Sequence, residues 1–202
     1  MADRDEPRGL TRRELFKGIG GGVLATGLLP HAAHADSAEV KGAVLGPGPV
    51  KLSFTVNGVA RTVEVEPRVT LLEALRDRLD LTGAKPVCER GACGACTVLL
   101  DGAPINACMM LAVDVAGRAV RTVEGLAHGD ELAPIQRAFV EYDALQCGFC
   151  TPGMVMSCAA LLERNASPTL ADVKHAVSGN LCRCGTYPKV FEATLSVARK
   201  GG

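Results

Sequence analysis

Eight of the nine cysteines in this chain fall into two groups of four, and cysteine thiolates are the ligands that hold iron–sulfur clusters. The first group is spaced C-x4-C-x2-C-x11-C and consists of Cys88, Cys93, Cys96 and Cys108. The second is spaced C-x2-C-x31-C-x-C and consists of Cys147, Cys150, Cys182 and Cys184. Each group predicts one cluster, and two clusters in 202 residues predict a relay for single electrons.

The spacing of the first group also indicates the cluster type. C-x4-C-x2-C followed by a distant cysteine is the plant-type [2Fe–2S] pattern, whereas the bacterial [4Fe–4S] run C-x2-C-x2-C-x3-C is absent. Gly91 and Gly94 lie inside this loop, where backbone without side chains can approach a cluster and direct N–H groups at its sulfurs. We therefore predict two [2Fe–2S] clusters, with Gly91 and Gly94 in the loop that binds the first.

Zinc and disulfides are the alternative uses of so many cysteines. Zinc sites favour C-x2–4-C knuckles or histidine partners, and the C-x-C of Cys182 and Cys184 is unusual for them. Cysteines in an exported protein suggest disulfides, so a disulfide-stapled binding module stays an alternative. The ninth cysteine, Cys158, lies in an apolar helical segment and is interpreted as a small buried residue.

The N-terminal segment has the features of an export signal. Residues 11–17 (TRRELFK) resemble the twin-arginine motif, an apolar Gly-rich run follows, and residues 33–35 form a small-x-small cleavage site. The twin-arginine route carries folded proteins, which suits clusters assembled in the cytoplasm. We predict a signal peptide over residues 1–35, cleavage after Ala35, a linker over 36–49 and a periplasmic protein.

Charge and composition argue against other classes of partner. The formal net charge is zero and tryptophan is absent, so neither electrostatics nor base stacking favours nucleic acid. The apolar run of the signal is shorter than the roughly 20 residues that a membrane span needs, and no later run is long enough. We expect no nucleic-acid partner and no membrane span.

The elements expected around the first group of cysteines form a small sheet with one helix. Residues 51–56 and 59–65 alternate in polarity and are joined by Asn57-Gly58, which predicts a β-hairpin. A helix capped by Thr70 is expected over residues 70–79.

Strands are expected over residues 97–100, 109–115 and 119–123. The order of hairpin, helix, cysteine loop and strand resembles the β-grasp of plant-type ferredoxins. It predicts a ferredoxin-type [2Fe–2S] domain over residues 50–125.

The second half of the chain has helical periodicity. Helices are expected over residues 132–142, 153–164, 169–177 and 188–200. The second group of cysteines lies at the junctions between them. We therefore predict an all-α four-helix [2Fe–2S] domain over residues 126–202, and an α+β fold class for the whole chain.

Two segments around the second group resemble a known signature. QCGFCTPGM at residues 146–154 and GNLCRCGTY at residues 179–187 are similar to the iron–sulfur subunit of the xanthine oxidase family of molybdenum hydroxylases. Many members read CTGY where this chain has CGTYP at residues 184–188. The CGTYP form resembles small subunits of exported bacterial dehydrogenases that act on aldehydes or on N-heterocycles such as isoquinoline.

The resemblance implies a subunit that transfers electrons and has no catalytic residue of its own. A large partner subunit would hold molybdopterin and hydroxylate an aldehyde or aromatic N-heterocycle, with Gln146 and Cys150 near the pterin. Electrons would leave through the ferredoxin-like cluster to an FAD subunit or a c-type cytochrome. A free-standing periplasmic carrier with two clusters stays the alternative.

Overall fold

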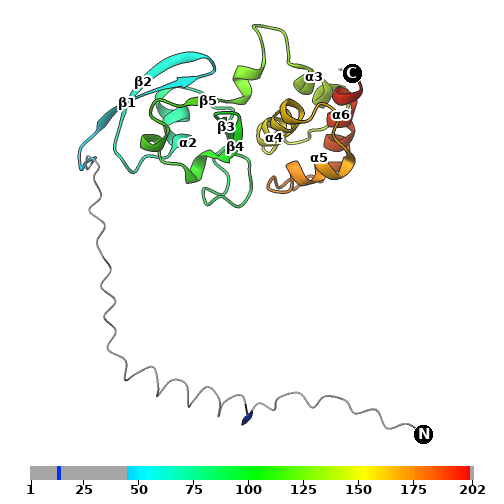
Figure 1. The fold of residues 1–202 in the computed structure, drawn as a ribbon, viewed down its shortest axis with the longest axis horizontal. Coiled ribbons are helices and arrows are strands. Elements are labelled where there is room, and N and C mark those ends of the chain that lie inside the picture. Colours follow the sequence, from blue (N-terminus) through cyan, green and yellow to red (C-terminus); the bar gives the residue numbers. More distant parts are fainter. Residues whose placement is uncertain (1–12, 15–44, 201–202) are drawn as a thin grey trace. The chain divides into compact units, whose positions relative to one another are not determined.

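The computed structural model describes residues 13–14 and 45–200. The predicted signal peptide, apart from residues 13–14, and most of the predicted linker lie outside the described residues. From Val50 onward the chain forms a five-stranded sheet followed by a group of helices (Figure 1). Within the described part of the chain, no helix combines the length and apolarity needed to cross a bilayer.

The hairpin predicted around Asn57-Gly58 is confirmed. Strands β1 (Val50–Val56) and β2 (Val59–Val65) pair antiparallel along their full length. Asn57 and Gly58 have φ angles of 51° and 79°, and positive φ at both central residues is what a two-residue type I′ turn requires. The turn therefore sets the register that buries one face of β1.

Three further strands complete the sheet: β3 (Thr97–Leu100), β4 (Ala103–Asn106) and β5 (Ala119–Arg121). The strand order is β2-β1-β5-β3-β4, with β5 parallel to β1 and antiparallel to β3. This mixed sheet, with a helix packed on it, confirms the predicted ferredoxin-like fold of the first half.

The strand predicted over residues 109–115 is wrong. Two short 3₁₀ helices occupy this region, η2 (Ala107–Met109) and η3 (Ala112–Val115). The strand that follows β3 and pairs with its outer edge is β4, which contains Pro104 and so lacks a strand-like sequence. A proline is tolerated there because β4 is an edge strand, where one N–H faces away from the sheet.

The helix predicted over residues 70–79 begins as α2 (Leu71–Glu73) and continues with π-helical hydrogen bonding as η1 (Ala74–Arg78). Its predicted cap is present, because the Thr70 hydroxyl accepts from the Glu73 amide at 3.2 Å. The Glu73 carboxylate in turn accepts from the Thr70 amide at 2.8 Å. This capping box starts the helix that covers the sheet.

The four helices predicted for the second half are confirmed. They are α3 (Pro134–Glu141), α4 (Thr151–Arg164), α5 (Leu170–Ala176) and α6 (Tyr187–Lys200). A further 3₁₀ turn, η4 (Val123–Leu126), leads from the sheet toward them. Figure 1 shows α4 on the side of the helical group that faces the sheet.

Strand β3 contributes to two hydrophobic cores. Val98 and Leu100 belong to the core between the sheet and α2, whereas Leu99 points to the opposite face and joins the helical core, which also contains Met154. Helix α4 packs on β3. Because β3 begins directly after Cys96 and α4 begins directly after Cys150, this packing brings the two cysteine loops together.

Candidate iron–sulfur sites

The first group of cysteines lies on a loop that leads into β3 and on the turn that follows β4. Cys96 and Cys108 are buried, while Cys88 and Cys93 are partly exposed. The amide of Gly91 donates to the Cys108 sulfur at 3.3 Å. Such N–H groups stabilise sulfur ligands that carry negative charge.

Both predicted loop glycines adopt left-handed backbone angles, with φ of 71° at Gly91 and 67° at Gly94. The Asn106 side chain donates to the Gly91 carbonyl at 3.1 Å and holds the loop against β4. A β-carbon on Gly91 would lie 2.9 Å from the Met109 side chain, which would have to shift, so the positive φ is the stronger reason for glycine here.

The thiols of the first group interact in two pairs. The Arg90 amide, and then the Cys93 side chain, lower the pKa of Cys88 to about 7. Burial raises the pKa of Cys96 to about 12, and the neighbouring Cys108 thiol adds to that increase. Cys88 thus interacts with Cys93, and Cys96 interacts with Cys108 and more weakly with Cys93.

The second group is paired in the same way. Burial, followed by the Cys182 side chain, raises the pKa of Cys150 to about 12. Burial also acts to raise the pKa of Cys182, but hydrogen bonds from the Thr186 hydroxyl and amide lower it to about 7. Cys147 interacts with Cys184 and is the one exposed cysteine of the described residues.

Paired thiols fit the predicted cofactor. A [2Fe–2S] cluster takes its four protein ligands as two for each iron. All nine cysteines lie within residues 45–200 and are free thiols there, and in that part of the chain no three His, Cys, Asp or Glu side chains are gathered around one point. Two pairs of cysteine thiols at each site, with backbone N–H groups directed at sulfur, suit a two-iron cluster. The assignment of these cysteines as ligands stays a prediction.

Comparison with known proteins agrees with this chemistry. Residues 54–121 match the 2Fe-2S iron-sulfur cluster binding domain, and residues 122–195 match the [2Fe-2S] binding domain. The nicotine 6-hydroxylase small subunit of Paenarthrobacter nicotinovorans is 52% identical over 146 residues, which cover 72% of this chain and 88% of that protein. The aldehyde oxidoreductase iron-sulfur-binding subunit PaoA of Escherichia coli K12 is 40% identical, covering 94% and 88%.

This chain is an iron–sulfur subunit of the xanthine oxidase family of molybdenum hydroxylases. Quinoline 2-oxidoreductase from Pseudomonas putida 86 contains a chain that superimposes with a TM-score of 0.71 at 44% identity, covering 76% of this chain and 98% of that one. As in its homologues, the subunit carries electrons within an oxidoreductase complex and has two [2Fe–2S] domains.

The predicted pterin-side residues of this molybdenum hydroxylase subunit lie at the start of α4. Gln146 is exposed and Cys150 is partly exposed, directly before the helix begins. The hydroxyl of Thr151 is buried without a hydrogen-bond partner. Beside it lies a cavity of about 320 Å³, lined mainly by apolar residues of α3, α4 and the intervening loop.

Cys158 is fully buried in the helical core, as expected. Burial raises the pKa of its thiol to about 12, which keeps the thiol protonated and unreactive. It therefore acts as a packing residue of this subunit.

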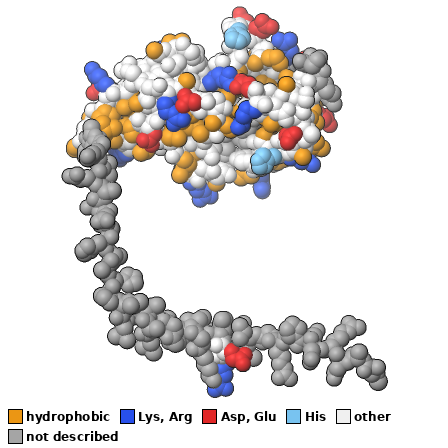
Figure 2. Space-filling view, viewed as in Figure 1, with side chains coloured by type: hydrophobic (Ala, Val, Ile, Leu, Met, Phe, Trp, Pro, Cys, Tyr) orange, Lys and Arg blue, Asp and Glu red, His pale blue; other side chains and the backbone are white. Residues whose placement is uncertain are grey.

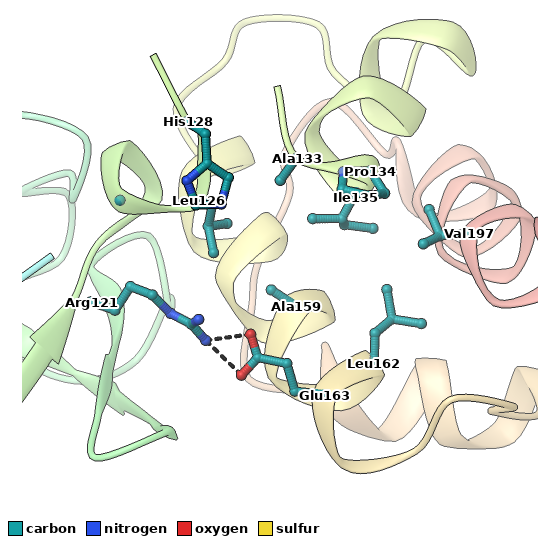
Figure 3. Close-up of a pocket in the computed structure, with 11 residues that line it drawn as sticks. Arg121, Leu126, His128, Ala133, Pro134, Ile135, Ala159, Leu162, Glu163 and Val197 are labelled. Carbon is teal, nitrogen blue, oxygen red and sulfur yellow. Dashed lines mark hydrogen bonds and ion pairs between the residues drawn. The ribbon is translucent and has the colours of Figure 1, made fainter. Parts of the chain in front are cut away.

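Several contacts between the two halves were not foreseen from the sequence. One guanidinium nitrogen of Arg121, on β5, donates to both carboxylate oxygens of Glu163, on α4, at the edge of a cavity of about 380 Å³ (Figure 3). Gly153 and Asn180 contact the Gly94 carbonyl. Asn180 lies within the GNLCRC segment, so the sequence signature includes this residue but does not predict its contact with Gly94.

Proposed function

We propose that this subunit accepts electrons from a molybdopterin-containing large subunit that oxidises an aldehyde or an aromatic N-heterocycle. The observation that carries the proposal is the packing of β3 on α4, which joins the two cysteine loops into one relay. The names of the relatives support the substrate class, because they refer to nicotine, aldehydes and quinoline. The partner's reaction would be R–H + H₂O → R–OH + 2 e⁻ + 2 H⁺.

The residues of this chain bind and orient rather than react with substrate. The bound [2Fe–2S] clusters supply one-electron acceptors. Cys147, Cys150, Cys182 and Cys184 would hold the cluster nearer the pterin, with Gln146 at that edge. The first group would hold the cluster from which electrons leave, toward an FAD subunit or a c-type cytochrome.

We place the large subunit on the apolar face of the helical half beside Gln146. Val140 is 60% exposed, Leu145 38% and Phe149 59%, and Val140 and Leu145 line the cavity of about 320 Å³. Interfaces between obligate subunits are apolar at their centres. On the face drawn in Figure 2, acidic and basic side chains are interspersed among apolar ones.

Substitution on this face tests the placement of the large subunit. Val140→Glu should reduce the molybdenum that co-purifies with the subunit while its iron content stays unchanged. Leu170→Glu is the matched control, because Leu170 is also exposed, at 45%, but begins α5. Equal molybdenum in the two variants would place the partner elsewhere.

We propose export to the periplasm by the twin-arginine route, supported by TRRELFK and by the small-x-small site before Asp36. Replacing Arg12 and Arg13 with lysine should leave the full-length protein in the cytoplasmic fraction. Replacing Arg4 and Arg8, outside the motif, should leave export intact. Cleavage and periplasmic recovery of the Arg12/Arg13 variant would contradict this route.

EPR of the dithionite-reduced complex, with iron and molybdenum analysis, tests the central proposal. Two distinct S = ½ signals, about four irons per chain and stoichiometric molybdenum are expected. Two signals without molybdenum or a partner would favour a free carrier, and absence of iron in anaerobic material would refute the cluster assignment.

A further inference from the structure

The side chain of Asn180 ties both cysteine loops to α4. Asn180 is only 4% exposed, and it lies two residues before Cys182. Its amide nitrogen donates to the carbonyl of Gly94, in the first cysteine loop, at 2.9 Å. Its amide oxygen accepts from the hydroxyl of Ser157, on α4, at 2.8 Å.

The other members of this network are buried and paired as well. Thr97 is 6% exposed and Ser157 5%. The Thr97 hydroxyl donates to the Gly94 carbonyl at 2.7 Å and accepts from Asn180 at 3.2 Å. A buried network in which every polar group has a partner holds one geometry, because each displacement leaves a group unpaired.

A backbone hydrogen bond beside Asn180 connects the two loops directly. The amide of Leu181 donates to the carbonyl of Cys93 at 2.9 Å. Leu181 precedes Cys182, so this hydrogen bond and one intervening residue connect the backbone of Cys93 with that of Cys182. Asn180 stabilises this connection on both loops. It precedes Leu181 in the chain, and its side chain is hydrogen-bonded to Gly94, the residue after Cys93.

We propose that Asn180 is the positioning residue that sets the distance and electronic coupling between the two clusters of this subunit. The inference rests on the proposed function, because it requires both clusters. In each transfer one cluster is oxidised and the other reduced by a single electron, and no proton has to cross the contact. Asn180 itself holds the loops and exchanges no electron.

Magnetic coupling between the reduced clusters provides a direct readout. Two S = ½ centres split each other's EPR lines, and the dipolar part of this splitting falls with the cube of their separation. Asn180→Leu keeps the branching at Cγ but removes all the side-chain hydrogen bonds. In the complex with its large subunit, the variant should keep about four irons and both signals, but lose or reduce the low-temperature splitting.

Two further variants complete the experiment. Ser157→Ala removes one partner of Asn180 and leaves its bond to Gly94, so it should reduce the splitting less. Thr194→Val is the matched control: Thr194 is fully buried, but its hydroxyl donates to Val190 within α6. The control should have wild-type splitting.

The outcomes separate this inference from the proposed function. Wild-type splitting in a fully loaded Asn180→Leu protein would overturn the role of Asn180 while leaving the relay intact. If Asn180→Leu does not fold, Ser157→Ala decides, and unchanged splitting there would overturn the inference. Absence of both signals in the wild-type complex would instead refute the proposed function, and this inference with it.

Discussion

A β-carbon on Gly153 would lie 2.1 Å from the carbonyl oxygen of Gly94. Gly94 belongs to the first cysteine loop, and Gly153 to the first turn of α4. The oxygen therefore occupies space that any other residue at position 153 would fill. This oxygen also accepts the hydrogen bond from Asn180, so the bare helix surface at Gly153 is part of the contact between the loops.

Gly153→Ala should push the first cysteine loop away from α4. The β-carbon and the Gly94 oxygen are both attached directly to backbone, so neither can rotate aside. We therefore expect a loss of about 1–3 kcal/mol in unfolding free energy. Denaturant unfolding of the loaded protein measures it. Gly179→Ala is the control, because no atom lies within 4 Å of a β-carbon there. Equal stability of the two variants would contradict the tight contact.

Single cysteine substitutions should distinguish ligands from the packing cysteine. Cys108→Ala should reduce iron from about four to about two per chain and remove one of the two EPR signals, because one [2Fe–2S] site loses a ligand. Cys184→Ala should remove the other signal. Cys158→Ala should keep both, since Cys158 packs in the helical core; a signal lost in that variant would show that Cys158 binds iron.

Tyr187→Phe should disturb the second site more than the first. The Tyr187 hydroxyl accepts from the Cys182 amide at 2.8 Å and donates to the Asn180 carbonyl at 3.0 Å. Removal of the hydroxyl leaves the partly buried amide of Cys182, a predicted ligand, without a hydrogen-bond partner, at a cost of about 1–3 kcal/mol in unfolding free energy.

Thermal unfolding and the EPR line positions of each cluster measure the effect of Tyr187→Phe. Tyr142→Phe, at the chain's other tyrosine, is the control. Line shifts confined to the first cluster would contradict the assignment of Tyr187 to the second loop.

The capping box at Thr70 should make part of the folding stability depend on pH in the acidic range. Hydrogen bonds from the Thr70 amide, and then its hydroxyl, lower the pKa of Glu73 from 4.5. A carboxyl group whose pKa is lower in the folded state stabilises the protein at pH values above its unfolded-state pKa. This contribution disappears as the pH falls through the folded-state pKa.

The Glu73→Gln variant keeps an acceptor at the cap but has no charge. Because Glu73 is largely exposed, we expect wild type to exceed the variant by less than about 1 kcal/mol at neutral pH. Melting curves should show this difference shrinking below about pH 4. A difference independent of pH would mean that the charge of Glu73 contributes nothing.

Local signals in the sequence predicted the parts of the fold that local chemistry determines. Asn57-Gly58 predicted the hairpin, and Thr70 predicted a helix cap that is present. β4 was missed because Pro104 is acceptable only at a sheet edge, and edge position depends on the whole sheet. The apolar run at residues 109–115 has the composition of a strand, but it contains the end of η2 and the whole of η3.

The candidate sites also contain features that the local sequence predicted and features that depend on the whole fold. Cysteine spacing was sufficient to predict two groups, and the structure brings each together in pairs. The contact of Asn180 with Gly94 joins residues far apart in the sequence, so no periodicity or motif spacing could reveal it. Its only signal was an asparagine within a recognisable segment.

The parallel pairing of β1 with β5 has a consequence for how the protein is made. All four cysteines of the first group lie between these strands in the chain, and Thr55 pairs with Ala119. A nascent chain on the ribosome therefore carries these cysteines before it can close the sheet beside them. Such non-local pairing forms slowly, so the predicted iron ligands that are synthesised first remain accessible thiols until a later part of the chain has been translated.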